Sequence, residues 1–128
     1  MMFYKNKIAL IDSQDAVLGN PAYDLASLID DVRIKTSNSF KSNILKVFLS
    51  KFKYKNESQF INDFEILSVL RNLKIIGIFT RLAKRDKKRK YLKLIPYAWK
   101  LIDNRIKNNT NFHDLKNFLQ KNPRIKKL

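Results

Sequence analysis

The longest run of helical periodicity in the chain, residues 57–83, constrains the fold more than any other feature. Its first half is amphipathic, with Phe60, Phe64 and Leu67 on one face, and its second half is apolar on nearly every side. A helix that is apolar all round is normally buried, so other helices must surround this one. Gly77 costs about 1 kcal/mol relative to alanine inside a helix, which indicates close packing there. The sequence therefore predicts a helical bundle organised around residues 57–83.

Shorter amphipathic segments supply the partners of this long helix. Asn20 followed by Pro21 is a typical helix start, with the asparagine as N-cap and the proline in the first turn. Asn38 or Ser39 is expected to cap a second helix, and Thr110 a later one. In each segment the apolar residues recur at a spacing of three and four, as in helices that bury one face. The four expected helices span residues 21–33, 39–53, 91–107 and 111–121.

The two ends of the chain are expected to be less regular. Residues 3–12 read as a hairpin with its turn at Lys5-Asn6. A lone hairpin is marginal without a surface to pack against. The basic residues 123–128 are expected to fray.

Three carboxylates between residues 8 and 31 form the best candidate site. An apolar strand, residues 8–11, ends on Asp12; Asp15 follows in a loop, and Asp24 lies in the first turn of the next helix. A carboxylate at the end of a buried strand is rigidly held, and Mg²⁺ prefers one or two carboxylates together with phosphate oxygens and water. The same residues also fit a structural interpretation, in which Asp12 and Asp15 are turn residues and Asp24 is a first-turn acid favoured by the helix dipole.

Two ordered segments resemble one known family. Residues 11–28 read IDSQDAVLGNPAYDLASL, and residues 71–92 read RNLKIIGIFTRLAKRDKKRKYL, followed by Pro96. Both resemble the aminoglycoside phosphotransferase family, small-molecule kinases with a protein-kinase-like fold. Within it they look most like the branch of bacterial cell-wall amino-sugar kinases, which phosphorylate N-acetylmuramate and N-acetylglucosamine at the anomeric hydroxyl. The resemblance covers nearly the whole chain but only the C-terminal part of the family domain. It implies that residues 1–128 form a single partial domain: a mainly α, helical C-terminal lobe with a short N-terminal β-hairpin.

The resemblance also assigns roles to the three carboxylates. Asp12 matches the metal-binding aspartate of the family, and Asp24 matches the helix aspartate that braces the catalytic loop from beneath. Asp15 matches a second acid near the metal. Ser13 stands where the family usually has an aromatic residue, which puts the local geometry beside the metal in question. The implied cofactors are Mg²⁺ and ATP, and the implied reaction is transfer of the γ-phosphoryl group to a sugar hydroxyl.

The dense run of charge at residues 84–90 admits two interpretations. As a connector it needs only to be solvated. In the family the corresponding segment leads into the last helices near the acceptor, so the resemblance makes Arg81, Arg85 and Asp86 candidates for contacting an anionic sugar. Basic residues inside the long helix, Arg71 among them, need partners if they are buried, and Asp30 or Asp31 could supply them.

Two parts of such a kinase do not occur in this sequence. The only histidine, His113, is followed by Asp114 and a leucine, which does not match the catalytic H-x-D-x-x-x-x-N loop. With only Gly19 and Gly77 there is no glycine-rich phosphate loop. We therefore expect the 128 residues alone to be inactive, with a separate N-terminal half-chain as the possible partner that completes the enzyme. A decayed remnant without activity fits the same pattern.

The net charge of +16 raises one alternative function. A strongly basic chain can bind nucleic acid or another anionic partner by releasing counterions, so an independent basic helical module is the alternative. The lysines are spread widely, an AT-rich genome would produce the same composition, and no nucleic-acid-binding motif occurs; we therefore do not expect nucleic acid to be the partner. No apolar run is long enough to span a membrane, and the start of the chain does not read as a signal peptide, so a cytoplasmic location without a membrane partner is expected.

Overall fold

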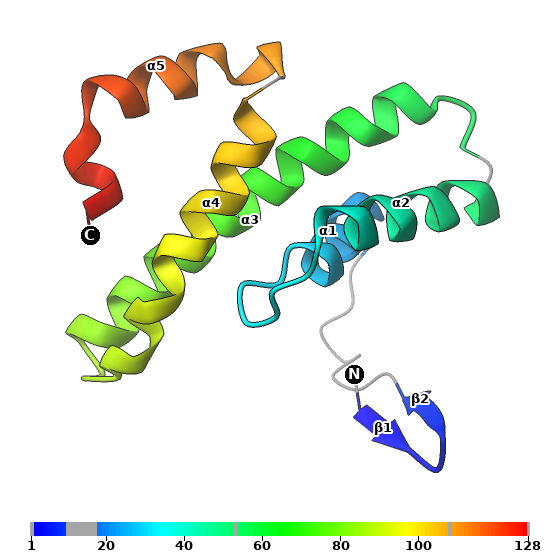
Figure 1. The fold of residues 1–128 in the computed structure, drawn as a ribbon, viewed down its shortest axis with the longest axis horizontal. Helices are drawn as coiled ribbons and strands as arrows, with labels where there is room; N and C mark the ends of the chain where they lie inside the picture. The colour runs from blue at the N-terminus through cyan, green and yellow to red at the C-terminus, as the bar shows by residue number, and fades with distance from the viewer. Residues whose placement is uncertain (1, 10–17, 53, 108, 128) are drawn as a thin grey trace.

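The computed structural model describes residues 2–9, 18–52, 54–107 and 109–127, and these residues fold mainly into helices (Figure 1). A two-stranded hairpin precedes the helices, as the sequence predicts. Asp12 and Asp15 lie outside the described residues. The elements in chain order are β1 Met2–Tyr4, β2 Lys7–Ala9, α1 Ala22–Ile29, α2 Asn38–Phe52, α3 Glu57–Lys84, the 3-10 helix η2 Arg89–Leu94, α4 Ile95–Ile106, the 3-10 helix η3 Thr110–Phe112, α5 His113–Lys121 and the 3-10 helix η4 Pro123–Lys127.

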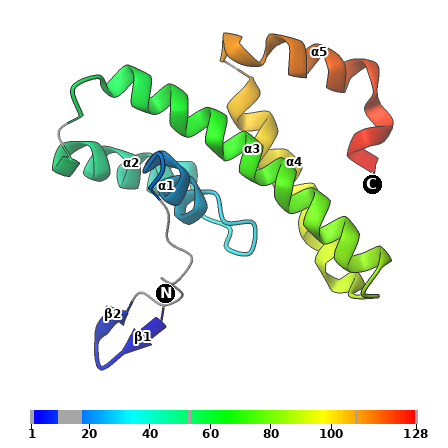
Figure 2. The same cartoon turned by 180° about the vertical axis from the view of Figure 1, so that it is seen from behind.

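Helix α3 is the central element, which confirms the prediction from its apolar second half. Helices α1 and α2 lie beside its N-terminal half, and α4 runs antiparallel along its C-terminal half (Figures 1 and 2). The side chain of Asn56 accepts a hydrogen bond from the backbone N–H of Gln59 at 3.0 Å and so caps the start of α3. No helix among the described residues is long and apolar enough to cross a membrane.

Two hydrophobic clusters lie along α3. The first joins α3, mainly its C-terminal half, to η2, α4, the C-terminal segment with η3 and α5, and Val32 after α1. The second joins the N-terminal half of α3 to the buried face of α1 and to α2. The first is built on Val32, Val69, Ile76, Phe79, Ile95, Ala98, Trp99, Leu101, Ile102, Ile106, Phe112 and Leu119, and the second on Ala22, Leu25, Ala26, Ile29, Leu49, Phe60 and Phe64.

The hairpin stands apart from the helices in both views (Figures 1 and 2). Its strands pair antiparallel, with Phe3 opposite Ile8. Lys5 and Asn6 both have positive φ, at 47° and 57°, as a two-residue turn that matches the strand twist requires, so the predicted turn is confirmed. The expectation of a buried strand is wrong for β2 in this chain, because Ile8 is 70% exposed.

Several helix details differ from the sequence predictions. Helix α1 ends at Ile29 rather than at residue 33, and Asp30 caps it. The hydroxyl of Ser37, not Asn38 or Ser39, accepts the backbone N–H of Phe40 at the start of α2. Gly77 is exposed, and a Cβ atom added there would meet nothing within 4 Å, so the expected close packing is absent at this position.

The C-terminal region is more ordered than the sequence suggests. The side chain of Asn109, not Thr110, caps η3 by accepting the N–H of Asn111 at 3.0 Å. The tail forms η4 instead of fraying, and Lys126 pairs with Asp103 at 2.6 Å. A basic tail residue therefore finds an acid on α4 that sequence spacing does not reveal.

Candidate functional site

The helix that follows the predicted metal aspartates is fixed at its first residues. Asp24 lies in the first turn of α1 and is exposed. The side chain of Asn20 accepts the backbone N–H of Ala22 at 3.0 Å and donates to Asp63 on α3 at 2.8 Å. The start of α1 is thereby tied to the central helix. Across the described ranges, no three His, Cys, Asp or Glu side chains gather in a way that could hold a metal ion.

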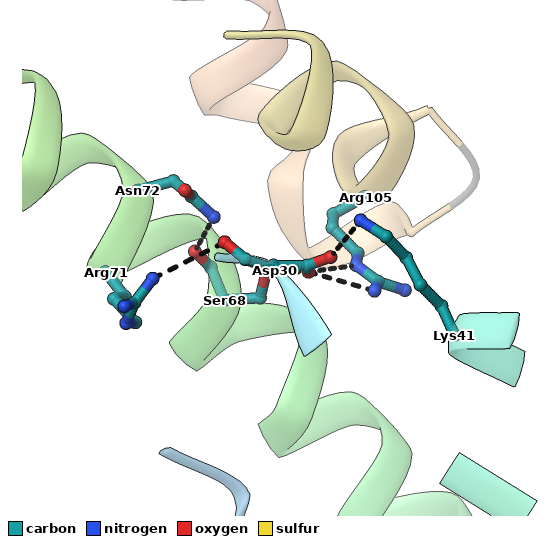
Figure 3. Close-up of polar contacts among 6 residues, drawn as sticks. All are labelled: Asp30, Lys41, Ser68, Arg71, Asn72 and Arg105. Atoms are coloured by element: carbon teal, nitrogen blue, oxygen red, sulfur yellow. Dashed lines mark hydrogen bonds and ion pairs between the residues drawn. The ribbon is translucent and has the colours of Figure 1, made fainter. Parts of the chain in front are cut away.

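A buried carboxylate at the other end of α1 organises the best-formed polar cluster of the described residues (Figure 3). Asp30 is 1% exposed. Its Oδ1 accepts a hydrogen bond from Lys41 Nζ at 2.9 Å. Its Oδ2 accepts from Ser68 Oγ at 2.6 Å, and from Arg105 Nε and Nη2 at 3.1 and 2.9 Å. Both carboxylate oxygens are therefore fully engaged by neighbouring donors.

Four elements meet at this carboxylate. Asp30 caps α1, Lys41 comes from the first turn of α2, Ser68 from the middle of α3 and Arg105 from the last turn of α4. Lys41 is buried in this arrangement, at 8% exposed. Burying an ammonium group is expensive unless it is paired and hydrogen-bonded, and Asp30 supplies that partner.

The α3 side of the cluster is also hydrogen-bonded (Figure 3). Arg71 Nη1 donates to the backbone carbonyl of Asp30 at 3.4 Å, and not to the carboxylate that the sequence offered as its partner. Asn72, which is fully buried, donates its amide to the carbonyl of Ser68 at 2.9 Å. Its Oδ1 atom has no partner within the described part of the chain.

The charges around Asp30 set its ionisation. Burial alone would raise the pKa of this carboxyl, but the charge of Arg105 and the hydrogen bonds from Ser68 and Lys41 outweigh that effect and lower the pKa below its usual value. Asp30 is therefore ionised at neutral pH. The neighbouring Asp31 also has a lowered pKa, chiefly because of its hydrogen bond to Arg33.

Arg105 links the cluster to both hydrophobic clusters. Its guanidinium carbon lies 4.7 Å from the ring centroid of Phe64, which belongs to the α1–α2 side. Its own helix contributes Ile102 and Ile106 to the other side. A pocket of about 280 Å³ opens beside the cluster, between the start of α2 and the end of α4. The arrangement can hold a small polar ligand against two cations already fixed by Asp30.

The acceptor-side candidates lie at the far end of α3. Arg85 Nε donates to Asp86 Oδ1 at 2.6 Å, and this hydrogen bond lowers the pKa of Asp86. Arg81 is exposed in the last turn of α3. The C-terminal end of α3 lies away from α1 in both views (Figures 1 and 2), so the structure does not bring these three residues together with Asp24.

Sequence reasoning missed the cluster because its members are far apart in the chain. Asp30 and Arg105 are separated by 75 residues. Two signals were nevertheless present: Ser68 interrupts the buried face of α3, and Arg105 adjoins the apolar stripe of Leu101, Ile102 and Ile106. A buried polar residue needs a hydrogen-bond partner, but the sequence does not say which one.

Comparison with known proteins finds similarity to one kind of enzyme. Three curated proteins, each named N-acetylmuramate/N-acetylglucosamine kinase, align with the chain. The protein from Caulobacter vibrioides is 34% identical over 97 residues, which is 76% of this chain and 27% of that protein. The protein from Neisseria meningitidis is 33% identical over 102 residues, 75% of this chain and 30% of that protein. This chain is related to sugar kinases.

The relationship covers only part of each relative. The Pseudomonas aeruginosa kinase is 24% identical over 129 residues, which is 96% of this chain but 38% of that protein. The chain thus spans between about a quarter and two fifths of the length of the curated relatives it matches. No family model and no solved structure matches the chain.

Proposed function

We propose that these residues supply the metal-binding segment and the helical C-terminal lobe of an ATP-dependent sugar phosphotransferase of the aminoglycoside phosphotransferase type. One observation carries the proposal: three sugar kinases align with three quarters or more of this chain. The mainly helical architecture with a short hairpin in front agrees with such a lobe.

In this proposal Asp12 and Asp15 hold Mg²⁺, and Asp24 braces the catalytic loop. Two carboxylates are a suitable donor set, because Mg²⁺ takes one or two carboxylates and completes its shell with phosphate oxygens and water. The ion would neutralise charge on the ATP phosphates. The contribution of this chain is to hold the acids in place, and the bonds of Asn20 to Ala22 and Asp63 fix the segment that follows them.

The proposed reaction moves the γ-phosphoryl group from ATP to a sugar hydroxyl. The bond between the γ-phosphorus and the bridging oxygen breaks, a bond from the sugar oxygen to phosphorus forms, and ADP leaves. The hydroxyl proton passes to a catalytic base, which these residues do not contain. The base and the nucleotide-binding lobe must come from residues outside this sequence, on the same or on another polypeptide.

Exposed apolar side chains on both sides of the proposed metal segment support a contact with other parts of the kinase. Ile8, Leu18, Tyr23 and Leu28 are all exposed, and they lie on both sides of the proposed metal segment. Large exposed apolar patches on soluble domains commonly mark interaction sites. We assign these exposed side chains, on β2, on α1 and just before α1, to contact with the rest of the kinase.

A segment exchange tests the proposal. The segment of the Pseudomonas kinase that aligns with 96% of this chain is replaced by the matching residues of this chain. Formation of ADP is then measured with N-acetylmuramate and with N-acetylglucosamine as acceptors. We expect turnover that is lost with Asp12→Asn and retained with Asp114→Asn, an exposed acid on α5. The 128 residues alone should show none.

Two results would argue against the proposal. A folded exchange protein without turnover, beside an active parent kinase, would contradict it. Turnover that survives Asp12→Asn would remove the assigned role of that residue.

The alternative of a basic binding module predicts instead that the 128 residues bind RNA with steep salt dependence and that Asp12→Asn leaves this binding unchanged. In the same exchange protein, Arg81→Gln and Arg85→Gln test the acceptor side, and we expect each to raise the KM for an anionic sugar. Arg85→Gln also removes the ion pair between Arg85 and Asp86, so it tests the role of Asp86 as well.

A further inference from the structure

The pocket beside the Asp30 cluster has no role in the proposed transfer. Its volume is about 280 Å³, just below the range of about 300–1,000 Å³ that is usual for ligand pockets, which suits only a small molecule. The start of α2 forms one wall and the end of α4 the other. Leu45, Phe64 and Leu101 form an apolar part of the lining. The face of a sugar ring packs readily on such a surface.

The cations of this pocket are held in place before any ligand arrives. Lys41 and Arg105 both line it, and both are fixed by hydrogen bonds to Asp30. Arg105 uses Nε and Nη2 for this carboxylate, and Nη1 donates to no acceptor within the described residues. Lys41 Nζ has one hydrogen bond, to Asp30, and an ammonium group carries three donors. Both side chains therefore keep donors for a further acceptor.

The charge balance of the pocket favours an anion. Lys107 adds a third cation to Lys41 and Arg105, against the single carboxylate of Asp30. Both oxygens of that carboxylate are already occupied by Lys41, Ser68 and Arg105. The side of α2 that lines the pocket carries Lys41 and no acidic residue.

Neutral polar groups complete the lining. Asn38, Ser42 and Asn104 border the pocket. None of their side chains has a hydrogen-bond partner in the part of the chain that the structure describes. Amide and hydroxyl groups of this kind can bind the hydroxyl and amide groups of a sugar while the cations bind an acid.

We propose that this pocket binds the anionic group, a carboxylate or a phosphate, of a small polar ligand such as a sugar acid or a sugar phosphate. The cations supply charge-assisted hydrogen bonds, which are stronger than neutral ones. The site does not depend on the proposed phosphoryl transfer, because it needs neither ATP nor a metal.

Binding is tested by NMR titration of the isotope-labelled 128-residue chain. The probes are inorganic phosphate, N-acetylmuramate, which carries a carboxylate, and N-acetylglucosamine, which carries none. We expect saturable shifts at the backbone amides of Ser42 and Asn104 with phosphate or N-acetylmuramate, and binding of N-acetylglucosamine that is about tenfold weaker or absent. Binding of phosphate alone would identify a phosphate ligand, and stronger binding of N-acetylmuramate a sugar acid.

Matched variants separate the pocket from the basic surface in general. Lys107→Gln should weaken binding about fivefold, while Lys100→Gln, an exposed lysine on α4 outside the pocket, should leave it unchanged. Because Lys107 also borders a second pocket beside α5, Asn104→Ala is tested against Asn43→Ala on the exposed side of α2. None of these side chains belongs to the Asp30 cluster, so the fold is retained.

Three results would overturn the inference. The first is equal affinity for N-acetylmuramate and N-acetylglucosamine together with no phosphate binding. The second is shifts confined to the basic residues 84–90. The third is equal loss of binding in Lys107→Gln and Lys100→Gln. Failure here leaves the kinase proposal untouched, since that proposal is tested by turnover in the exchange protein.

Discussion

Replacing Asp30 by asparagine should destabilise the fold far more than the same change at its neighbour Asp31. Asp30 is 1% exposed and binds Lys41, Ser68 and Arg105 through both oxygens. An asparagine keeps one acceptor oxygen and turns an amide N–H₂ toward a donor. Lys41, whose side chain is 9% exposed, and Arg105, at 21%, would then be left without a counter-charge.

The expected loss follows from the burial of these cations. Removing one partner of a buried ion pair costs roughly 3–5 kcal/mol, because it leaves an uncompensated charge in the interior. The total free energy of unfolding of a domain is about 5–15 kcal/mol. The partner of Asp31 is Arg33, which is 71% exposed, and a surface pair of this kind is worth about 0–1 kcal/mol. Asp31→Asn is therefore a matched control.

Urea unfolding followed by circular dichroism at neutral pH measures both variants. A second set, Lys41→Met alone and combined with Asp30→Asn, tests the cause. Since the double variant removes one of the unpaired cations, it should lose less than the sum of the two single losses. The reasoning would be refuted if Asp30→Asn lost no more stability than Asp31→Asn, or if the losses simply added.

Three further predictions concern stability. The folded pKa of Asp30 lies below its unfolded value of about 3.9, so the stability that its charge contributes is present above that pH and is lost as the pH falls through the folded pKa. The difference in urea stability between the native chain and Asp30→Asn should therefore be constant above about pH 5 and shrink in more acidic solution. A difference that widened there would contradict this. Asn109→Ala should cost about 0.5–2 kcal/mol, because its side chain caps η3 and donates to Glu65 at 2.7 Å, whereas Thr110→Ala should be near neutral in the same thermal unfolding; equal losses would favour Thr110 as the cap. Gly77→Ala should raise stability by about 1 kcal/mol, because the position is exposed, helical and open to a Cβ, and a lower melting temperature would show that the glycine is needed.

The helices and their order could be predicted from the sequence because local signals determine them. The apolar surface of residues 57–83 predicts a central helix, and α3 takes that place. The turn at Lys5-Asn6 and the core face of α1 follow from spacing alone. The ends were less accurate, because Ser37 and Asn109 compete with equally good capping residues beside them.

Long-range pairing could not be predicted. Lys41 looks like an exposed lysine until α1, α3 and α4 are placed around it, and Arg105 meets Asp30 only when α4 folds back along α3. The pocket between α2 and α4 depends on that same packing. The candidate site residues named from the sequence lie far apart in the structure: Asp24 is at the start of α1, and Arg85 follows the end of α3.

The dependence of ADP formation on Mg²⁺ in the exchange protein tests the central claim most directly. Initial rates with N-acetylmuramate are measured over a range of Mg²⁺ concentrations for the protein with Asp12 intact and for Asp12→Asn, Asp15→Asn and Asp114→Asn. The account predicts Mg²⁺-dependent turnover with Asp12 intact, loss of that turnover in Asp12→Asn, a higher Mg²⁺ requirement in Asp15→Asn, and an unchanged profile in Asp114→Asn. Identical Mg²⁺ profiles for all four proteins would contradict it.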